Sequence, residues 1–199
     1  MDMVRCPWCE GDELYTAYHD TEWGVPLYDD HKLFELLILE GAQAGLSWIT
    51  ILRRREGYRA AFNGFDVQKI ARYGTKDLER LMGDPRIIRN RRKILSAKEN
   101  ARAFLALQKE AGSFSAWLWK HVDGKPVDNY PKTMGDIPAL TPLSQTISKE
   151  LKQLGFTFVG PTIMYAYLQS AGLVNDHLAD CFTRKRIRQT VRSRVSSRQ

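Results

Sequence analysis

The sequence predicts an all-α fold, and three observations support this prediction. Apolar residues recur at helical spacing in several segments, most clearly in 30–40 and 90–110. Residues that start helices (Asp, Asn, Ser or Thr) precede many of these segments, and glycine follows several of them. No stretch of alternating apolar and polar residues is long enough to build a β-sheet. The 199 residues, 43% of them hydrophobic, can therefore bury a helical core without disulfides.

The individual helices follow from local start and stop signals. Asp66 is a good N-cap, Thr75 can cap the next helix, and Thr141 precedes a proline at the first helical position. Residues 123–139 contain three prolines and two glycines, so we expect a loop there. The segments expected to be helical are 30–40, 47–62, 67–73, 75–82, 90–110, 113–121, 142–154 and the one that begins at Pro161.

Composition predicts that the chain works in a reducing compartment and has no membrane-spanning segment. It has three cysteines and no recognisable signal peptide, and its longest apolar stretch, around residues 36–39, is far too short to span a membrane. We therefore expect a cytoplasmic protein that acts as a monomer.

The positive charge is concentrated at the C-terminal end. The formal net charge is +7, and residues 182–199 contain seven basic and no acidic side chains, so the rest of the chain holds 23 of each sign. We expect residues 1–182 to form the domain and residues 183–199 to be a disordered basic tail. Such a tail attracts phosphates without regard to sequence, and by itself it is weak support for nucleic-acid binding.

Cysteine and histidine residues near the two ends form a candidate metal site. Cys6 and His19 are spaced as C-x12-H, and His177 and Cys181 as H-x3-C. Two thiols and two imidazoles complete the ligand set of a tetrahedral structural zinc site. The second pair would share one face of a helix, whereas the interval between the first pair resembles a loop. Spacing alone supports scattered residues without a metal equally well, and Cys6 with Cys9 could instead form a redox pair.

A carboxylate and a group of aromatic residues mark the first fifty residues. Glu40 stands in a markedly apolar stretch, where it is either a buried acid of the kind found at functional sites or the exposed end of a helix. The aromatic residues near it are either ordinary packing or a stacking pocket for a flipped base. They are Trp8, Tyr15, Tyr18, Trp23, Tyr28 and Trp48.

Two further segments are compatible with phosphate contacts. Around residues 154–162 a helix ends, a tight link follows and a new helix opens, so Gly160 could let backbone N–H groups approach a phosphate. The same layout also describes an ordinary helix–helix turn. Residues 86–94 hold five basic side chains, which either contact phosphates or form a solvated helix face.

Taken together, these residues resemble the DNA-3-methyladenine glycosylase I family. The resemblance runs in order from about residue 5 to residue 181. The matching motifs are Arg5-Cys6-x-Trp8, Ala17-Tyr18-His19-Asp20-x-Glu22-Trp23-Gly24-Val25-Pro26, Leu39-Glu40-Gly41-x-Gln43-Ala44-Gly45-Leu46-Ser47-Trp48-Ile49-Thr50, Ile87-Ile88-Arg89, Gly155-Phe156-x-Phe158-Val159-Gly160 and Gly172-Leu173-Val174-Asn175-Asp176-His177.

The resemblance implies a helix-hairpin-helix DNA glycosylase with one structural zinc ion that joins the N- and C-terminal segments. The implied zinc ligands are Cys6, His19, His177 and Cys181, which leaves Cys9 outside the site.

The family's functional residues carry over to matching positions. Its essential carboxylate falls on Glu40. Its base-contacting aromatics fall on Tyr15, Tyr18 and Trp48, with Trp8 and Trp23 lining the pocket, and we expect the DNA backbone at Gly160, Thr162 and Arg89.

The implied activity is base excision in DNA repair. The enzyme would release 3-methyladenine from double-stranded alkylated DNA by hydrolysis and leave an abasic site. Methylation at N3 makes the adenine cationic, so the glycosidic bond is already weak and the leaving group needs no protonation. Glu40 can accept a hydrogen bond from the exocyclic amine, and stacking adds roughly 1–3 kcal/mol per base. No catalytic lysine is evident, so we expect no strand cleavage.

The chain departs from the wider pattern at three positions. Phe158 replaces the first glycine of the hairpin, and Arg86 stands where the family usually has glycine. The aspartate used by other helix-hairpin-helix glycosylases has Asp176 as its nearest candidate. We expect Asp176 to be structural, as a neighbour of the zinc ligands, although it remains a rival of Glu40 for the catalytic role. Two other hypotheses are a DNA-binding module without catalysis and a redox protein that uses Cys6 and Cys9.

Overall fold

The computed structural model describes residues 3–196, with side chains described as far as residue 189. The α-helices are α1 Glu13–Thr21, α2 Asp30–Gln43, α3 Trp48–Leu52, α4 Arg55–Ala61, α5 Val67–Ala71, α6 Thr75–Gly83, α7 Arg91–Ala111, α8 Phe114–Trp119, α9 Pro142–Gln153, α10 Pro161–Ser170 and α11 Phe182–Ser196. Short 3-10 helices are η1 Pro7–Cys9, η2 Asn63–Phe65, η3 Lys120–Val122 and η4 Met134–Asp136, and the strands are β1 Val127–Asp128 and β2 Val174–Asn175.

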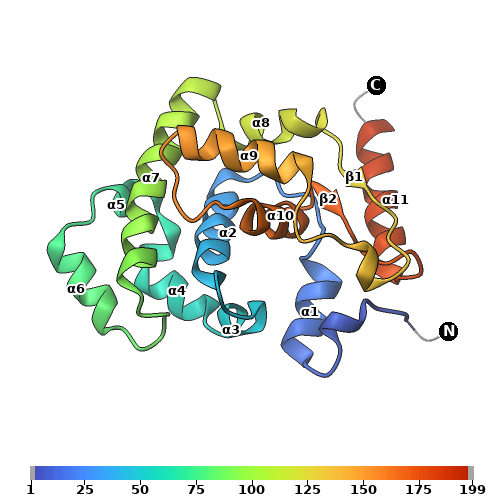
Figure 1. The fold of residues 1–199 in the computed structure, drawn as a ribbon, viewed down its shortest axis with the longest axis horizontal. Coiled ribbons are helices and arrows are strands. Elements are labelled where there is room, and N and C mark those ends of the chain that lie inside the picture. The colour runs from blue at the N-terminus through green and yellow to red at the C-terminus, as the bar shows by residue number, and fades with distance from the viewer. Residues whose placement is uncertain (1–2, 197–199) are drawn as a thin grey trace.

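Helix α2 runs through the middle of the molecule beside α10, with α5, α6 and α7 to one side and α1 and α11 to the other (Figure 1). It packs against α3, α7, α8 and α10. Because neighbours surround it, side chains around most of its circumference are buried, including Leu33, Phe34 and Leu37. Burial of each such side chain contributes about 1.5–3 kcal/mol. The core therefore holds α2 rigidly, and residues near its end inherit that rigidity.

Several predicted helix starts are confirmed by capping hydrogen bonds. The Asp66 carboxylate accepts from the Lys69 N–H, and Asn90 accepts from the Lys93 N–H at the start of α7. Thr141 caps α9 through the Ser144 N–H. These signals are local, because a side-chain oxygen satisfies an N–H group that has no partner inside the helix.

Two predicted helices differ in detail. The helix expected over 47–62 is two helices, because α3 packs against α1 and α2 whereas α4 packs against η2, and one straight helix cannot reach both. The expected cap at Thr75 is wrong: Thr75 is the first residue of α6, and the Gly74 N–H donates to the Asp77 carboxylate instead.

Helix α1 occupies an interval for which the sequence predicted a loop. Asp12 caps it by accepting from the Tyr15 N–H at 2.9 Å. It has no broad apolar stripe, and its fully buried side chains are Tyr18 and His19. A helix that buries aromatic and polar side chains against a specific partner leaves no periodic signal. The strand pair is equally short, with β1 parallel to β2 over two residues.

Residues 183–196, where we expected a disordered tail, belong to helix α11, which begins at Phe182. Arg184 is 1% exposed, forms an ion pair with Asp128, and donates to the His177 carbonyl at 3.1 Å. Its guanidinium also lies 4.4 Å from the centre of the Tyr130 ring. These contacts order the helix start despite its positive charge. Residues 197–199 lie outside the described residues.

Across residues 3–196 we find no helix with the length and apolarity needed to cross a membrane.

Candidate active site and metal cluster

The terminal cysteine and histidine residues converge on one point. Cys6 precedes η1, His19 lies on α1, and His177 and Cys181 follow β2. All four are buried, and their ligand atoms lie within 4.8 Å of one another. Chain ends that are remote in sequence are thus brought together through four metal-ligating groups. The expected helix that carries both His177 and Cys181 is wrong, since these residues lie in the loop between β2 and α11.

The distances within this Cys/His cluster suit a tetrahedral ion. The Sγ atom of Cys181 lies 3.5 Å from both His19 Nε2 and His177 Nδ1, and those two nitrogens lie 3.2 Å apart. Bond lengths of about 2.0–2.3 Å around a tetrahedral zinc separate neighbouring ligand atoms by roughly 3.3–3.8 Å. The residues therefore fit one metal ion, and four protein ligands leave no position for a reactive water.

The other ring nitrogens are held by partners. His19 Nδ1 lies 2.8 Å from Asp20, which also accepts a bidentate pair from Arg5. His177 Nε2 donates to the Trp23 carbonyl at 2.9 Å. Such contacts orient a ligating imidazole and fix which nitrogen faces the metal. Asp20 was not predicted to contact a zinc ligand, although it lies in the matching motif.

Gly24 explains part of the same motif. Its φ of +77° is a conformation that other residues rarely adopt, and a Cβ there would lie 3.0 Å from His177 Nε2. Cys9, by contrast, does not join the cluster, because its thiol donates to the Cys6 carbonyl at 3.1 Å. The cysteines are free thiols, so the structure gives no support to a Cys6–Cys9 pair.

A cavity of about 220 Å³ lies next to the cluster and gathers the predicted site residues from α1, α2, α3 and η1. Of the aromatic residues singled out in the sequence, only Tyr28 lies elsewhere, stacked on Trp119 at 4.5 Å. The predicted residues that line the cavity are Trp8, Tyr15, Tyr18, Trp23, Glu40 and Trp48. Those that sequence reasoning missed are Gln43, Met134, Ile137, Ala166, Gln169 and Ser170.

Glu40 is a buried acid in this cavity. The residue is 1% exposed, and its Oε1 accepts a hydrogen bond from Ser170 at 2.8 Å. Its Oε2 has no hydrogen-bond partner among the described residues. Burial raises the pKa of Glu40 to about 8, and the Ser170 hydrogen bond opposes this shift. The alternative of a solvent-exposed helix end is therefore wrong.

The aromatic walls also carry unsatisfied polar atoms. Trp8 meets Tyr15 and Trp23 edge-on at 4.9 and 5.0 Å, and Tyr18 lies 5.6 Å from Trp48. The Tyr18 hydroxyl and the Trp48 indole nitrogen are buried without a partner among the described residues. Buried polar groups are normally hydrogen-bonded, so these two atoms and the Oε2 atom of Glu40 are available to a ligand that enters the cavity.

Comparison with known proteins identifies the family of this chain. The family model for methyladenine glycosylase matches residues 8–184. The chain belongs to the methyladenine glycosylase family. It is 49% identical over 179 residues to DNA-3-methyladenine glycosylase 1 of Escherichia coli (strain K12), covering 90% of this chain and 96% of that protein.

Solved structures show the same family relationship. A crystal structure of 3-methyladenine DNA glycosylase I matches with a TM-score of 0.88 and 50% identity, covering 90% of this chain and 98% of that one. A second match, at 41% identity and a TM-score of 0.88, is a study of 3-methyladenine recognition by the Staphylococcus aureus enzyme, and it covers 92% of this chain and 97% of that one. The chain is accordingly an enzyme that acts on N-glycosyl bonds.

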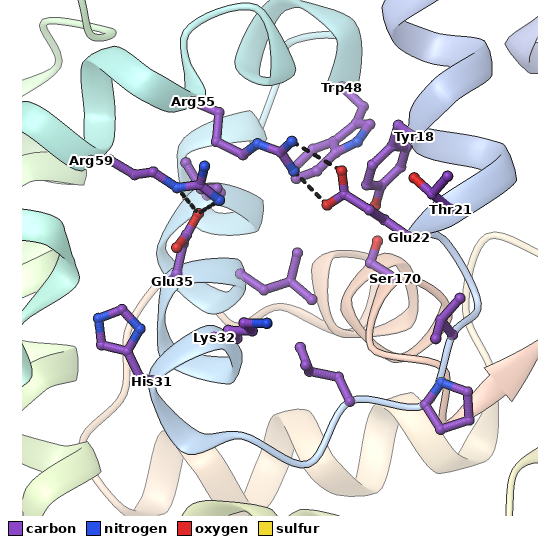
Figure 2. Close-up of a pocket in the computed structure, with 15 residues that line it drawn as sticks. Tyr18, Thr21, Glu22, His31, Lys32, Glu35, Trp48, Arg55, Arg59 and Ser170 are labelled. Carbon is purple, nitrogen blue, oxygen red and sulfur yellow. Dashed lines mark hydrogen bonds and ion pairs between the residues drawn. The ribbon is translucent and has the colours of Figure 1, made fainter.

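A second, larger cavity of about 570 Å³ shares lining residues with the first in this methyladenine glycosylase. Tyr18, Trp48 and Ser170 line both cavities and form the wall between them. Figure 2 shows the ion pairs of the larger one, in which Arg55 binds Glu22 at 2.6 and 3.0 Å and Arg59 binds Glu35 at 2.8 Å. These four charged groups thus have partners, unlike the Oε2 atom of Glu40, which has none among the described residues.

The link between α9 and α10 has a rigid backbone. Asn100 binds both the carbonyl and the N–H of Thr157, at 3.0 and 2.8 Å, and Ser148 donates to the Val159 carbonyl at 2.6 Å. Phe158 adopts a φ of +56°, the left-handed conformation that a glycine takes easily. Gly160 is the N-cap of α10. The departure at Phe158 therefore leaves the turn intact.

Asp176 is structural, but not as expected. It is 2% exposed and accepts hydrogen bonds from Tyr165, Gln169 and Asn129 at 2.5–2.8 Å. It does not line the Glu40 cavity, and its carboxylate bonds none of the cluster's ring nitrogens among the described contacts. The expected contact with a zinc ligand is wrong, since Asp20 fills that place.

The basic stretch before and within α7 divides into three kinds of side chain. Arg86 pairs with the Asp84 carboxylate, which holds the pKa of Asp84 down at about 2. Lys93 turns inward and donates to two carbonyls. The exposed members whose side chains have no partner among the described residues are Arg89, Arg91 and Arg92.

Proposed function

We propose that this chain flips 3-methyladenine out of alkylated double-stranded DNA and hydrolyses its N-glycosidic bond, leaving an abasic site. The observation that carries the proposal is Glu40, a buried carboxylate in an aromatic cavity with one oxygen that has no partner among the described residues. A cavity of about 220 Å³ is below the roughly 300–1,000 Å³ typical of drug-sized ligands, so it suits a single base. The named substrate of the relatives is consistent with this size.

Glu40 supplies recognition that depends on charge. With a pKa of about 8, the carboxyl group is mostly protonated at neutral pH while the cavity is empty. A cationic base nearby favours the charged form. The carboxylate then accepts a hydrogen bond from the exocyclic amine and stabilises the positive ring. A neutral adenine offers no such charge, so it gains less from entering the site.

The aromatic walls supply the remaining binding energy. Stacking of a base on an aromatic side chain is worth roughly 1–3 kcal/mol. The rings of Trp48 and Tyr18 are tilted relative to each other with their centres 5.6 Å apart, and both line the cavity. A cationic ring gains further attraction to their π faces. The glycosidic bond of the methylated base is weak, so water can attack the sugar carbon once the nucleotide is out of the stack.

DNA is held outside the cavity. We propose that the N-terminus of α10, with Gly160 and Thr162, binds one phosphate, and that Arg89 binds another. Thr162 and Arg89 are exposed and available for such contacts.

We further propose that the Cys/His cluster binds one structural zinc ion. The burial of all four ligands supports this choice, as do the distances among the ligand atoms of His19, His177 and Cys181. The ion would cross-link the terminal segments and take no part in the chemistry, because no ligand position remains open.

The deciding experiment measures release of free 3-methyladenine from methylated duplex DNA. Glu40→Gln should lower the single-turnover excision rate by at least 100-fold while the protein stays folded. Glu35→Gln is the matched control, because Glu35 lies on the same helix but faces the larger cavity. Wild-type protein that binds methylated DNA and releases no base would instead favour a binding module without catalysis.

A further inference from the structure

Lys93 differs from the other basic residues of segment 86–94 because its ammonium group points into the protein. It sits in the first turn of α7, and its Nζ donates to the carbonyls of Ala42 and Ala44 at 2.8 and 2.6 Å. Both carbonyls belong to the end of α2, where the last carbonyl groups of a helix have no partner inside the helix. A cation there also interacts favourably with the helix dipole.

The segment held by Lys93 joins two walls of the base cavity. Glu40 precedes it on α2, and Trp48 follows it as the first residue of α3. Between them the chain makes a tight turn, with a bond of 2.6 Å from the Leu46 N–H to the Gln43 carbonyl and a φ of +78° at Gly45. The hydrogen bonds of Lys93 therefore connect this turn to the long helix α7.

Gln43 lies between the two residues whose carbonyls accept hydrogen bonds from Lys93, and it lines the Glu40 cavity. Its carboxamide has no hydrogen bond among the described contacts, whereas its backbone carbonyl accepts the Leu46 N–H of the turn. A carboxamide offers both donors and an acceptor. In this position it can contact the polar edge of a base that Glu40 also contacts.

We propose that Lys93 is a positioning residue that fixes Gln43 in the cavity wall, and that Gln43 is a further contact for the flipped base. This inference rests on the proposed excision of 3-methyladenine. Lys93 does not act as a phosphate contact, because its ammonium group is directed to the end of α2. Burial lowers the pKa of Lys93, in agreement with its inward position.

The test separates a positioning residue from a phosphate contact. Lys93→Met removes the ammonium group and keeps most of the stem, and Arg92→Met removes a charge from the neighbouring exposed position. We expect Lys93→Met to lower the single-turnover excision rate at saturating protein by about 10- to 100-fold, because small displacements at a site are costly. Its affinity for undamaged DNA and the salt dependence of that affinity should stay unchanged. Arg92→Met should instead lower the affinity for undamaged DNA and its salt dependence, and should leave the excision rate at saturating protein unchanged.

A double-mutant cycle identifies Gln43 as the group through which Lys93 acts. Gln43→Ala should slow excision, and Lys93→Met combined with Gln43→Ala should be no slower than the slower single variant. If Lys93→Met proves unstable, Gln43→Ala alone decides, since it keeps every hydrogen bond of Lys93. Excision at the wild-type rate by Gln43→Ala overturns the proposal, and so does a Lys93→Met variant that changes only DNA affinity. Wild-type protein that releases no base would contradict the proposed function itself.

Discussion

The Cys/His cluster and the Glu40 cavity are neighbouring sets of buried polar groups. They differ in whether those groups have hydrogen-bond partners. In the cluster, each histidine uses one nitrogen toward the other ligands and the other toward a fixed partner. In the cavity, Glu40, Tyr18 and Trp48 each retain a buried polar atom without a partner among the described residues. Buried groups without partners cost about 1–3 kcal/mol each. A closed set of this kind stabilises the fold, whereas an open one is kept for a ligand.

The two regions share a wall, so their roles are linked. The ring centre of Trp8 lies 5.3 Å from that of His19, and the ring centre of Trp23 lies 4.5 Å from that of His177. Both tryptophans also line the Glu40 cavity. Helix α1 likewise directs His19 to the cluster and Tyr18 to the cavity. The cluster therefore holds the aromatic half of the cavity against the half that carries Glu40.

The largest effect is expected from Cys181→Ser, which removes one ligand of the cluster. A cross-link that closes a loop of more than 100 residues is worth roughly 5 kcal/mol, which corresponds to a fall in Tm of about 10–20 °C for a domain of this size. Metal analysis and thermal unfolding measure the outcome. Cys9→Ser is the control, because Cys9 lies outside the cluster and should leave the metal content unchanged. Equal metal content in both variants would contradict the proposal that the Cys/His cluster binds a structural zinc ion.

Glu40→Gln should stabilise the fold in alkaline solution, in contrast to the cluster variant. The pKa of Glu40 in the folded state, about 8, lies above the ordinary value of 4.5. The folded protein thus binds more protons between these values, and stability falls as pH rises through this range. Each pKa unit is worth about 1.4 kcal/mol, so the variant should gain roughly 3–5 kcal/mol at pH 9 and almost nothing at pH 5.

Denaturant unfolding of wild type and variant at pH 5, 7 and 9 checks this prediction. A stability difference that does not vary with pH would show that Glu40 titrates normally.

Trp48→Ala should weaken binding of the free base by 1–3 kcal/mol, about 5- to 150-fold, through lost stacking. Calorimetric titration with 3-methyladenine measures the change. Tyr28→Ala is the matched control, because that ring stacks on Trp119 away from the cavity. A similar loss in both variants would point to general destabilisation instead of a specific wall.

The smallest effect is expected at the DNA surface. Arg89→Ala should reduce the slope of log affinity against log salt concentration by about 0.9, the value for one lost phosphate contact. Arg86→Ala should leave the slope unchanged, because the Arg86 side chain is bound to Asp84. Fluorescence anisotropy with undamaged duplex DNA at several salt concentrations measures both slopes. Equal slopes for Arg89→Ala and wild type would remove Arg89 from the interface.

The helices that were predicted correctly are those with local signals. Asp66, Asn90 and Thr141 stabilise helix starts through hydrogen bonds to residues three positions away, so the sequence contains the whole interaction. Helices α1 and α11 were not predicted, since their order comes from distant partners such as Asp128 for Arg184. The sequence of α1 also lacks a broad apolar stripe.

The site follows the same division. The sequence by itself determined the kinds of ligand at the two ends of the chain, the apolar surroundings of Glu40 and the aromatic residues near it. Only the tertiary structure decided that Glu40 is buried with a free oxygen, that Asp176 is fully hydrogen-bonded elsewhere, and that Ser170 and Gln43 complete the cavity. Burial and unpaired polar atoms depend on neighbours from remote segments, and no local pattern of residues records which neighbours those will be.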